Sequence, residues 1–289
     1  MLSLLGVLFD GIAYGMLLFL ISVGLSVTLG MMNFINLAHG VFAMAGGYLL
    51  VTLTGKAGIG FLAALPIVFV CTAAFSFLVE RTLYRPLYRA THLKQVLLTV
   101  GIILVAVAVA TYAFGPAQQP VKLPGALAGQ ADILGLEVSR YKLFLIAIGI
   151  AITLALVFGL ERTRFGARIR ASVDRQGTAE AMGIHVGRVF QLTLAIGSGL
   201  AGLGGALGVN ILGLDPHFPL KTLVYFLLVV VVGGAGSIPG TLLAAMVLGI
   251  ADTAGKYYLP EVGAFIIYAA MIGLLLAFPH GLLGRRRLA

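Results

Sequence analysis

The chain has 289 residues, of which 60% are hydrophobic and only 10% are charged. An average soluble chain carries about 25% charged residues, so this composition excludes an ordinary soluble domain. Inside a bilayer the backbone polar groups must be satisfied within the protein, so spanning segments are helices or closed barrels. The apolar runs are continuous rather than alternating, and they predict an all-α membrane protein.

The net charge of +9 does not indicate nucleic-acid binding, because the basic residues cluster on one predicted side of the membrane. Four lie at 81–94, six at 161–188 and three at 285–287, and the other six are spread over the opposite side. Segments rich in Lys and Arg are retained in the cytoplasm, so this pattern orients the chain. The N-terminus lacks the basic region of a cleaved signal peptide, and we expect a retained first span.

The first predicted span, Gly11–Gly30, is followed by a polar interruption and then by Val41–Thr54, which is too short to cross a bilayer. The interruption carries Asn33, Asn36 and His39. On a helix these residues, three apart, would share one polar stripe inside the membrane. Two roles stay open for them. They cap and bond the ends of a broken helix, or they line a translocation path, because intramembrane polar groups usually face a cavity.

A long charged stretch at 161–188, here called the central segment, contains six arginines and must stay in water. Its charge predicts a cytoplasmic location, and Gly177 and Gly183 are expected to break and end a short surface helix. The external loop Pro116–Tyr141 is too rich in Pro and Gly for a helix. Further spans are predicted at Phe61–Leu83, Val96–Phe114, Leu143–Leu160, Val189–Leu212 and Phe265–Leu283.

Small residues recur at four-residue intervals in the span after the central segment. At this spacing two helices can approach closely in lipid, where packing rather than the hydrophobic effect drives contact. The residues are Gly197, Ala201 and Gly205 in one row and Gly204 and Gly208 in another.

A second interruption, GGAGSIPG at 233–240, separates two short apolar pieces, Leu223–Val232 and Thr241–Ile250, with Asp252 expected outside the membrane. It forms a tight turn between half-helices or a flexible joint beside a pore, and both interpretations stay open. Interruptions in both halves of a chain point to a translocation site near the midplane of the bilayer. We therefore expect about eight transmembrane segments, two of them broken or re-entrant, in a single polytopic domain over 1–289.

No pattern for catalysis, metal binding or nucleotide binding is found. The chain has a single cysteine, Cys71, and no HExxH pattern, and its two Gly-Lys pairs lack the rest of a phosphate loop. No ladder of intramembrane carboxylates indicates a proton relay. The sequence therefore favours a non-enzymatic pore, without catalytic, metal-binding or cofactor-binding residues, that a partner drives through the central segment. The alternatives are a partner-free secondary transporter or channel and an intramembrane hydrolase that uses His39.

Four stretches together resemble the permease subunits of branched-chain amino acid ABC importers. They are GLSVTLGMMNFINLAHG, GARIRASVDRQGTAEAMGIHVGRV, GGAGSIPGTLLAAMVLGIAD and FPHGLLG. The resemblance covers nearly the whole chain and is to the shorter permease of the usual unlike pair. It implies a multi-pass protein of the bacterial cytoplasmic (inner) membrane that moves branched-chain or related amino acids by alternating access. The partners that it implies are cytoplasmic ATPase subunits, a second permease subunit (unlike or identical), a periplasmic substrate-binding protein and membrane lipid.

By the same resemblance, the central segment is an EAA-like coupling loop that docks in a groove of the ATPase. The residues assigned to it are Gly166, Arg168, Arg170, Ala171, Asp174, Glu180, Ala181, Gly183 and Ile184. The residues predicted for the translocation path are Asn33, Asn36, His39, Gly233, Gly234, Gly236 and Ser237. Val41 departs from the acidic residue that family members often carry there. This departure leaves amides, urea and aromatic or dicarboxylic acids as alternative substrates.

Overall fold

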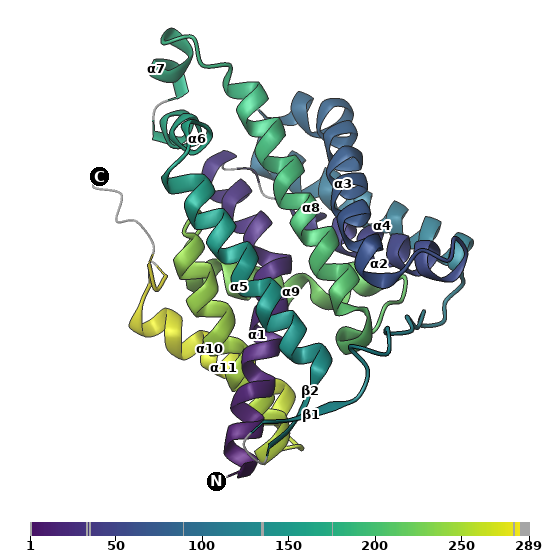
Figure 1. Cartoon of the computed structure of the whole chain (residues 1–289). Helices are drawn as coiled ribbons and strands as arrows, with labels where there is room; N and C mark the ends of the chain where they lie inside the picture. The colour runs from purple at the N-terminus through teal and green to yellow at the C-terminus, as the bar shows by residue number, and fades with distance from the viewer. Residues whose placement is uncertain are drawn as a thin grey trace.

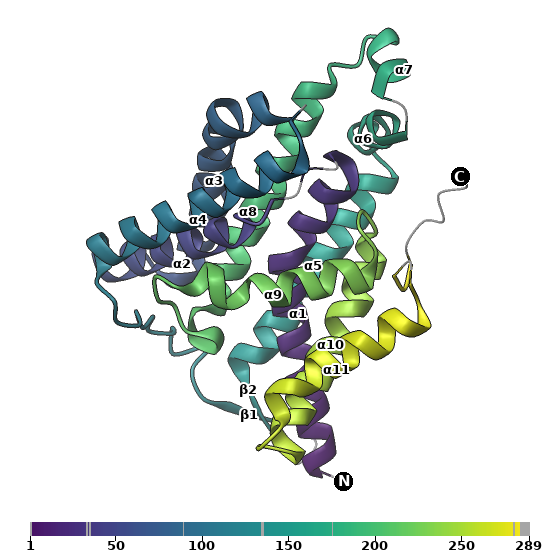
Figure 2. The same cartoon turned by 180° about the vertical axis from the view of Figure 1, so that it is seen from behind.

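The computed structural model describes residues 2–32, 34, 36–88, 90–133, 136–174, 176–279 and 281–283. Within these ranges the chain forms eleven α-helices and one short β-hairpin (Figures 1 and 2). The helices are α1 (Leu2–Met32), α2 (His39–Gly55), α3 (Phe61–Val79), α4 (His92–Phe114), α5 (Arg140–Glu161), α6 (Arg164–Asp174), α7 (Gln176–Ala181), α8 (Val186–Leu212), α9 (Phe218–Gly233), α10 (Ile238–Tyr258) and α11 (Gly263–Ala277). A π-helical turn, η1 (Glu80–Tyr84), and a 3₁₀ turn, η2 (Arg85–Leu87), extend α3.

The prediction of a helical membrane protein is confirmed. Six helices are long and apolar enough to cross a membrane: α1, α3 with its extension, α4, α5, α8 and α10. Helices α2, α9 and α11 are apolar but shorter. The short α2 agrees with the sequence, whereas α11 ends at Ala277, earlier than predicted.

Helix α10 is longer than predicted, because the charges near its end do not terminate it. It runs over 21 residues and includes Asp252, which was expected outside the membrane but is only 2% exposed. Lys256, one turn later on the same helix, lies 2.6 Å from the Asp252 carboxylate. An ion pair between residues four apart stabilises a helix, so α10 continues past Asp252.

The bundle is organised around α1 and α8. Gly24 of α1 lies against Gly197 of α8, and Gly205 of α8 lies against Ala43 of α2. A methyl group at Gly205 would stand 2.0 Å from the Ala43 carbonyl oxygen, so only glycine permits this approach. The close packing predicted from the glycine rows is confirmed, and the rows serve two neighbouring helices, α1 and α2.

The other helices surround this core. Helix α10 runs antiparallel to α1, with Gly11 against Ile250 and Gly30 against Gly236. Helices α3 and α4 lie on the α2 side, α11 packs on α10, and α9 crosses the middle of the bundle (Figure 2). The central segment forms α6 and α7 at one end, and the N-terminus and the hairpin lie at the opposite end (Figure 1).

The hairpin was not predicted. Its strands, β1 (Gln130–Ile133) and β2 (Leu136–Ser139), pair antiparallel with Gln130 opposite Ser139, at the end of the loop for which no helix was expected. Strands of four residues are too short to show a reliable alternating pattern in a sequence.

Candidate functional site

The central segment folds as two short helices at one end of the bundle (Figure 1). Helix α6 is amphipathic: Gly166, Ile169 and Ser172, three residues apart, are buried, whereas Arg164 and Arg168 are exposed. The buried face packs against α1, α5 and α8. The basic face of α6 is therefore left at the surface.

Helix α7 ends in a glycine cap. The Ile184 N–H donates to the Ala179 carbonyl and the Gly183 N–H to the Glu180 carbonyl, both over 3.0 Å, and Gly183 has a φ of 81°. This pair of bonds is a Schellman motif, which favours glycine at the left-handed position. The predicted role of Gly183 is confirmed. The prediction for Gly177 is wrong, because Gly177 lies inside α7 and the division between the helices falls before Gln176.

An apolar cluster holds the two short helices on the start of α8. Ala179, Val186 and Phe190 form its buried centre, and Ala171 and Ile184 pack against them. Met182, directly after α7, is 79% exposed and lies outside this cluster.

The predicted coupling residues differ in their exposure to solvent. Arg168, Glu180, Ala181 and Gly183 are exposed; Gly166 is buried; Arg170, Ala171 and Ile184 are half-buried. Asp174 ends α6, and its side chain lies outside the described part of the chain.

Residues 34 and 36–38, the described part of the first interruption, are not helical, so the single helical stripe predicted for its polar residues is wrong. Asn36 lies in this link between α1 and α2, His39 begins α2, and Asn33 lies outside the described residues. The two described side chains are buried and face different partners. The His39 Nε2 donates to the Ile21 carbonyl of α1 over 2.9 Å. The Asn36 Oδ1 accepts from the Tyr84 hydroxyl over 3.1 Å.

A buried network of aromatic and polar side chains connects this link to the start of α8. The Tyr88 hydroxyl donates to the Glu80 Oε1 over 2.7 Å, and the Tyr88 ring lies edge-on to Phe34 and Phe190, at 5.9 and 6.4 Å between ring centres. Phe34 also packs on Tyr84, at 5.2 Å. Burial raises the pKa of the Tyr88 hydroxyl, as does its hydrogen bond to Glu80, so the phenol stays protonated and donates.

Sequence reasoning missed this network. Glu80 and Tyr88 stand in a basic stretch that reads as an ordinary loop between spans, yet Glu80 is only 1% exposed. Glu80 opens the π-helical turn η1, and such turns are frequent at functional sites.

The second interruption is a tight turn between α9 and α10. Gly234 and Gly236 have φ values of 88° and 85°, and the Ser237 hydroxyl accepts from the Gly240 N–H over 3.1 Å, which caps α10. The Gly236 N–H donates to the Ser26 carbonyl of α1 over 2.9 Å. The turn interpretation is confirmed, and the role of a joint beside a pore stays a prediction.

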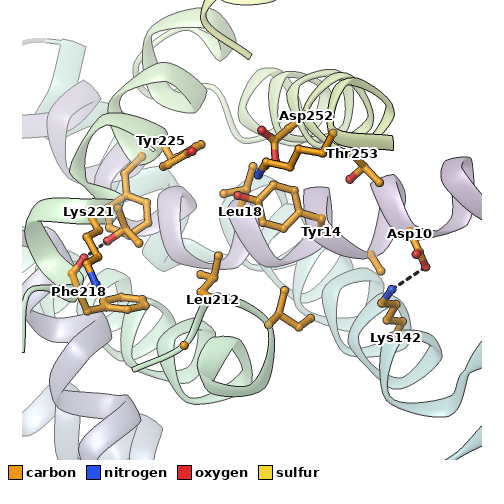
Figure 3. A pocket seen from close by; sticks show the side chains of 16 residues that line it. Asp10, Tyr14, Leu18, Lys142, Leu212, Phe218, Lys221, Tyr225, Asp252 and Thr253 are labelled. Atoms are coloured by element: carbon orange, nitrogen blue, oxygen red, sulfur yellow. Dashed lines mark hydrogen bonds and ion pairs between the residues drawn. The ribbon is translucent and has the colours of Figure 1, made fainter. Parts of the chain in front are cut away.

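A cavity of about 450 Å³ is lined by residues of α1, α5, α8, α9 and α10 (Figure 3). Its wall includes two complete acid–base pairs, Asp10 with Lys142 at 2.8 Å and Asp252 with Lys256 at 2.6 Å. A third lysine in the wall, Lys221, is paired with Asp215 just outside it. Apolar and aromatic side chains stand between these charges, among them Tyr14, Leu18, Leu212, Phe218, Tyr225 and Phe226.

The cavity was missed because Asp252 was expected outside the membrane and because the other pair in the wall, Asp10 with Lys142, joins distant parts of the sequence. One signal was present in the sequence: Asp252 and Lys256 are four residues apart in a stretch whose apolar pattern continues on both sides. Among the described residues, the path positions predicted at the two interruptions do not line this cavity.

The sequence profile of the family described as "Branched-chain amino acid transport system / permease component" matches residues 7–275. The chain belongs to this family. It is therefore a permease component of a branched-chain amino acid ABC transport system, a multi-subunit assembly, and it is not an enzyme.

Curated relatives align with the permease over nearly its whole length. The high-affinity branched-chain amino acid transport system permease protein BraD of Pseudomonas aeruginosa is 27% identical over 96% of this chain and 95% of its own. The corresponding protein LivH of Escherichia coli K12 is 27% identical over 96% and 94%. A probable branched-chain amino acid transport permease protein LivH of Methanocaldococcus jannaschii is 28% identical over 96% and 92%. No solved structure matches the chain.

With these relatives the membrane location of the permease is established: it is a multi-pass membrane protein homologous to bacterial inner-membrane permeases. The resemblance drawn from its four sequence stretches is confirmed, including its likeness to the shorter permease of the pair.

Proposed function

We propose that this permease forms, with a second permease subunit that is unlike or identical, the membrane path of an ATP-driven importer. A substrate-binding protein delivers the solute at the hairpin end, and two ATPase subunits bind at the α6/α7 end. The names of the relatives support branched-chain or related amino acids as the substrates. Val41 keeps a second candidate class, namely aromatic or dicarboxylic acids, amides and urea.

The position of the central segment carries this proposal. Helices α6 and α7 lie at the end of the bundle, where the basic face of α6 and the side chain of Met182 are exposed. Their inner faces pack on the start of α8. A segment that is rigidly attached inside and open outside can transmit a rigid-body displacement from a docked partner. We assign residues 161–188 as the coupling loop, with Gly166, Arg168, Arg170, Ala171, Asp174, Glu180, Ala181, Gly183 and Ile184 as its motif residues.

The route from the coupling loop into the bundle follows packed side chains. Phe190 belongs to the cluster under α7 and also contacts the Tyr88 ring, which contacts Phe34 in the link after α1. Both interruptions are bonded to α1, through His39 at the link and Gly236 at the turn. We infer that these interruptions, with Asn33, Asn36, His39, Gly233, Gly234, Gly236 and Ser237, change shape as the path opens to one side and then to the other.

The membrane topology follows from the same orientation. We place the α6/α7 end in the cytoplasm, because residues 161–188 include six arginines in the sequence. The six long helices cross the membrane. Two of the shorter helices α2, α9 and α11 would bring the number of membrane segments to the eight expected, and all three would bring it to nine. The whole chain, 1–289, acts as a single permease domain.

Uptake by reconstituted proteoliposomes tests this function. The complete transporter, with ATPase subunits and substrate-binding protein, is expected to accumulate L-leucine only when ATP is supplied on the ATPase side. Proteoliposomes that hold the permease subunits alone are expected to show no accumulation under proton or sodium gradients. Accumulation by the permease alone would support a secondary transporter and contradict the proposal.

A further inference from the structure

The cavity beside α10 has the chemistry of a site for a zwitterion. We propose that it binds the head group of an α-amino acid, with Asp252 holding the ammonium group and Lys256 the carboxylate. This inference rests on the proposed function, because it specifies the ligand that the import path accepts.

Asp252 has an unused acceptor in an apolar environment. Its side chain is 2% exposed and lines the cavity, and one oxygen, Oδ2, accepts from the Lys256 ammonium over 2.6 Å. The other oxygen, Oδ1, is buried and has no hydrogen-bond partner within the described ranges of the chain. A buried carboxylate oxygen without a donor is unfavourable, so the site as it stands lacks a donor. A primary ammonium group carries three N–H donors and no acceptor, which suits this carboxylate.

Lys256 occupies the place that the substrate ammonium would take. Its side chain is 52% exposed, and its Nζ lies 5.7 Å from the centre of the Tyr14 ring. The α-ammonium of an amino acid is chemically equivalent to this ε-ammonium, so the two can exchange on Asp252 without leaving a buried carboxylate unpaired. The displaced Lys256 keeps its charge and its flexible stem, and it can pair with the carboxylate of the same ligand.

The other two acid–base pairs do not offer the same combination. Asp10 and Lys142 have side chains that are 43% and 31% exposed, where water screens their charges. Asp215 is already satisfied on both oxygens, since Oδ1 accepts from the His217 N–H over 2.8 Å and Oδ2 pairs with Lys221. Of the three carboxylates, Asp252 is thus the one that joins deep burial to a vacant oxygen.

The rest of the cavity suits the apolar part of such a ligand. Its volume of about 450 Å³ lies within the range of small-molecule sites. Leu18, Phe218 and Phe226 provide apolar walls, and Tyr14 and Tyr225 face the same space from α1 and α9 (Figure 3). Urea, amides and dicarboxylic acids have no ammonium group for Asp252, so the cavity favours amino acids over these alternatives.

Protection of an engineered thiol tests the site directly. Cys71 is replaced by Ala, and Thr253, a half-buried residue of the cavity wall, by Cys. The complete reconstituted transporter is then labelled with a methanethiosulfonate reagent in the presence of one of three probes.

The three probes differ in their charged groups: L-leucine has both, 4-methylpentanoate lacks the ammonium and 3-methylbutylamine lacks the carboxylate. We expect L-leucine to slow labelling and the two analogues to leave the rate unchanged. Equal protection by 4-methylpentanoate would overturn the role of Asp252.

Two variants and one control separate binding from folding. In Asp252→Asn the concentration of L-leucine needed for protection should rise about tenfold or more, because a charge-assisted hydrogen bond is lost. Glu261→Gln makes the same chemical change at an exposed position outside the cavity and should protect like the parent. The exchange Asp252→Lys with Lys256→Asp keeps an ion pair for folding but reverses the charges, and it should also lose protection. Protection retained in that double variant would show that the pair is only structural.

The outcomes distinguish this inference from the proposed function. If the parent transporter accumulates L-leucine with ATP but Asp252→Asn accumulates it equally well, the site is wrong and the proposed function stands. If the parent accumulates no amino acid and L-leucine gives no protection, both fail.

Discussion

Gly24 of α1 and Gly197 of α8 are in direct backbone contact. A methyl group at Gly24 would lie 2.1 Å from the Gly197 carbonyl oxygen, and one at Gly197 would lie 2.9 Å from the Gly24 Cα. Two helices this close gain dispersion contacts along their backbones, which is how helices associate stably in lipid. The contact joins the two helices on which the bundle is built.

Gly24→Ala is therefore expected to separate α1 from α8 and to abolish the folded permease, with Gly197→Ala less severe because its nearest contact is longer. The yield of monodisperse permease after solubilisation and its unfolding temperature measure this. Gly101→Ala on α4 is the matched control, because a methyl group there meets nothing within 4 Å. Alanine should stabilise that helix by up to about 1 kcal/mol. An unchanged unfolding temperature in Gly24→Ala would contradict the packing.

Tyr88→Phe is expected to lower the stability of the permease by about 1–3 kcal/mol, because it leaves a buried oxygen of Glu80 without its donor. If the network also transmits motion from the coupling loop, the amount of L-leucine imported per ATP hydrolysed should fall as well. Tyr112→Phe is the control, since Tyr112 is 95% exposed. A variant that loses stability but keeps the import ratio would leave the network a purely structural role.

Variants of His39 distinguish the two roles that the sequence left open for the first interruption, namely bonding the helix ends and lining the path. Its Nε2 bonds the Ile21 carbonyl and its side chain is 1% exposed, so His39→Leu should destabilise the contact between α1 and α2. His39→Gln keeps an N–H donor and should restore much of the unfolding temperature. If His39→Gln is as stable as the parent but does not import L-leucine, His39 serves the path rather than the packing.

The sequence was sufficient for features that depend on residue type at each position. The cost of inserting charge into lipid marks the apolar spans and the water-exposed central segment without any knowledge of contacts. The glycine rows of α8 predicted a close approach between helices, because glycine has no side chain and its spacing can be read directly from the sequence. Which helices approach was not visible, since Gly24 and Ala43 stand far from their partners along the chain.

Features that depend on the path of the chain and on contacts between side chains were predicted poorly. Asn33, Asn36 and His39 are spaced as a helical stripe, but the chain leaves the helix after α1, so spacing alone misplaced Asn36. Asp252 was expected outside the membrane, beyond the predicted end of its helix, and an isolated carboxylate would be costly inside it. Its pairing with Lys256 one turn away reduces that cost, and this contact brings the charge into the cavity wall.

The most direct test of the coupling assignment is the amount of L-leucine imported per ATP hydrolysed by complete transporters carrying Met182→Glu. Met182 is 79% exposed at the tip of the coupling loop, so the change should spare folding and remove an apolar contact with the ATPase. Burial of such a side chain contributes about 1.5–3 kcal/mol, and the import ratio should fall about tenfold or more. Leu259→Glu, at an apolar residue that is 54% exposed at the opposite end, is the control and should import normally. Normal import by Met182→Glu in stoichiometric complexes would contradict the claim that α7 is the element through which the ATPase drives this permease.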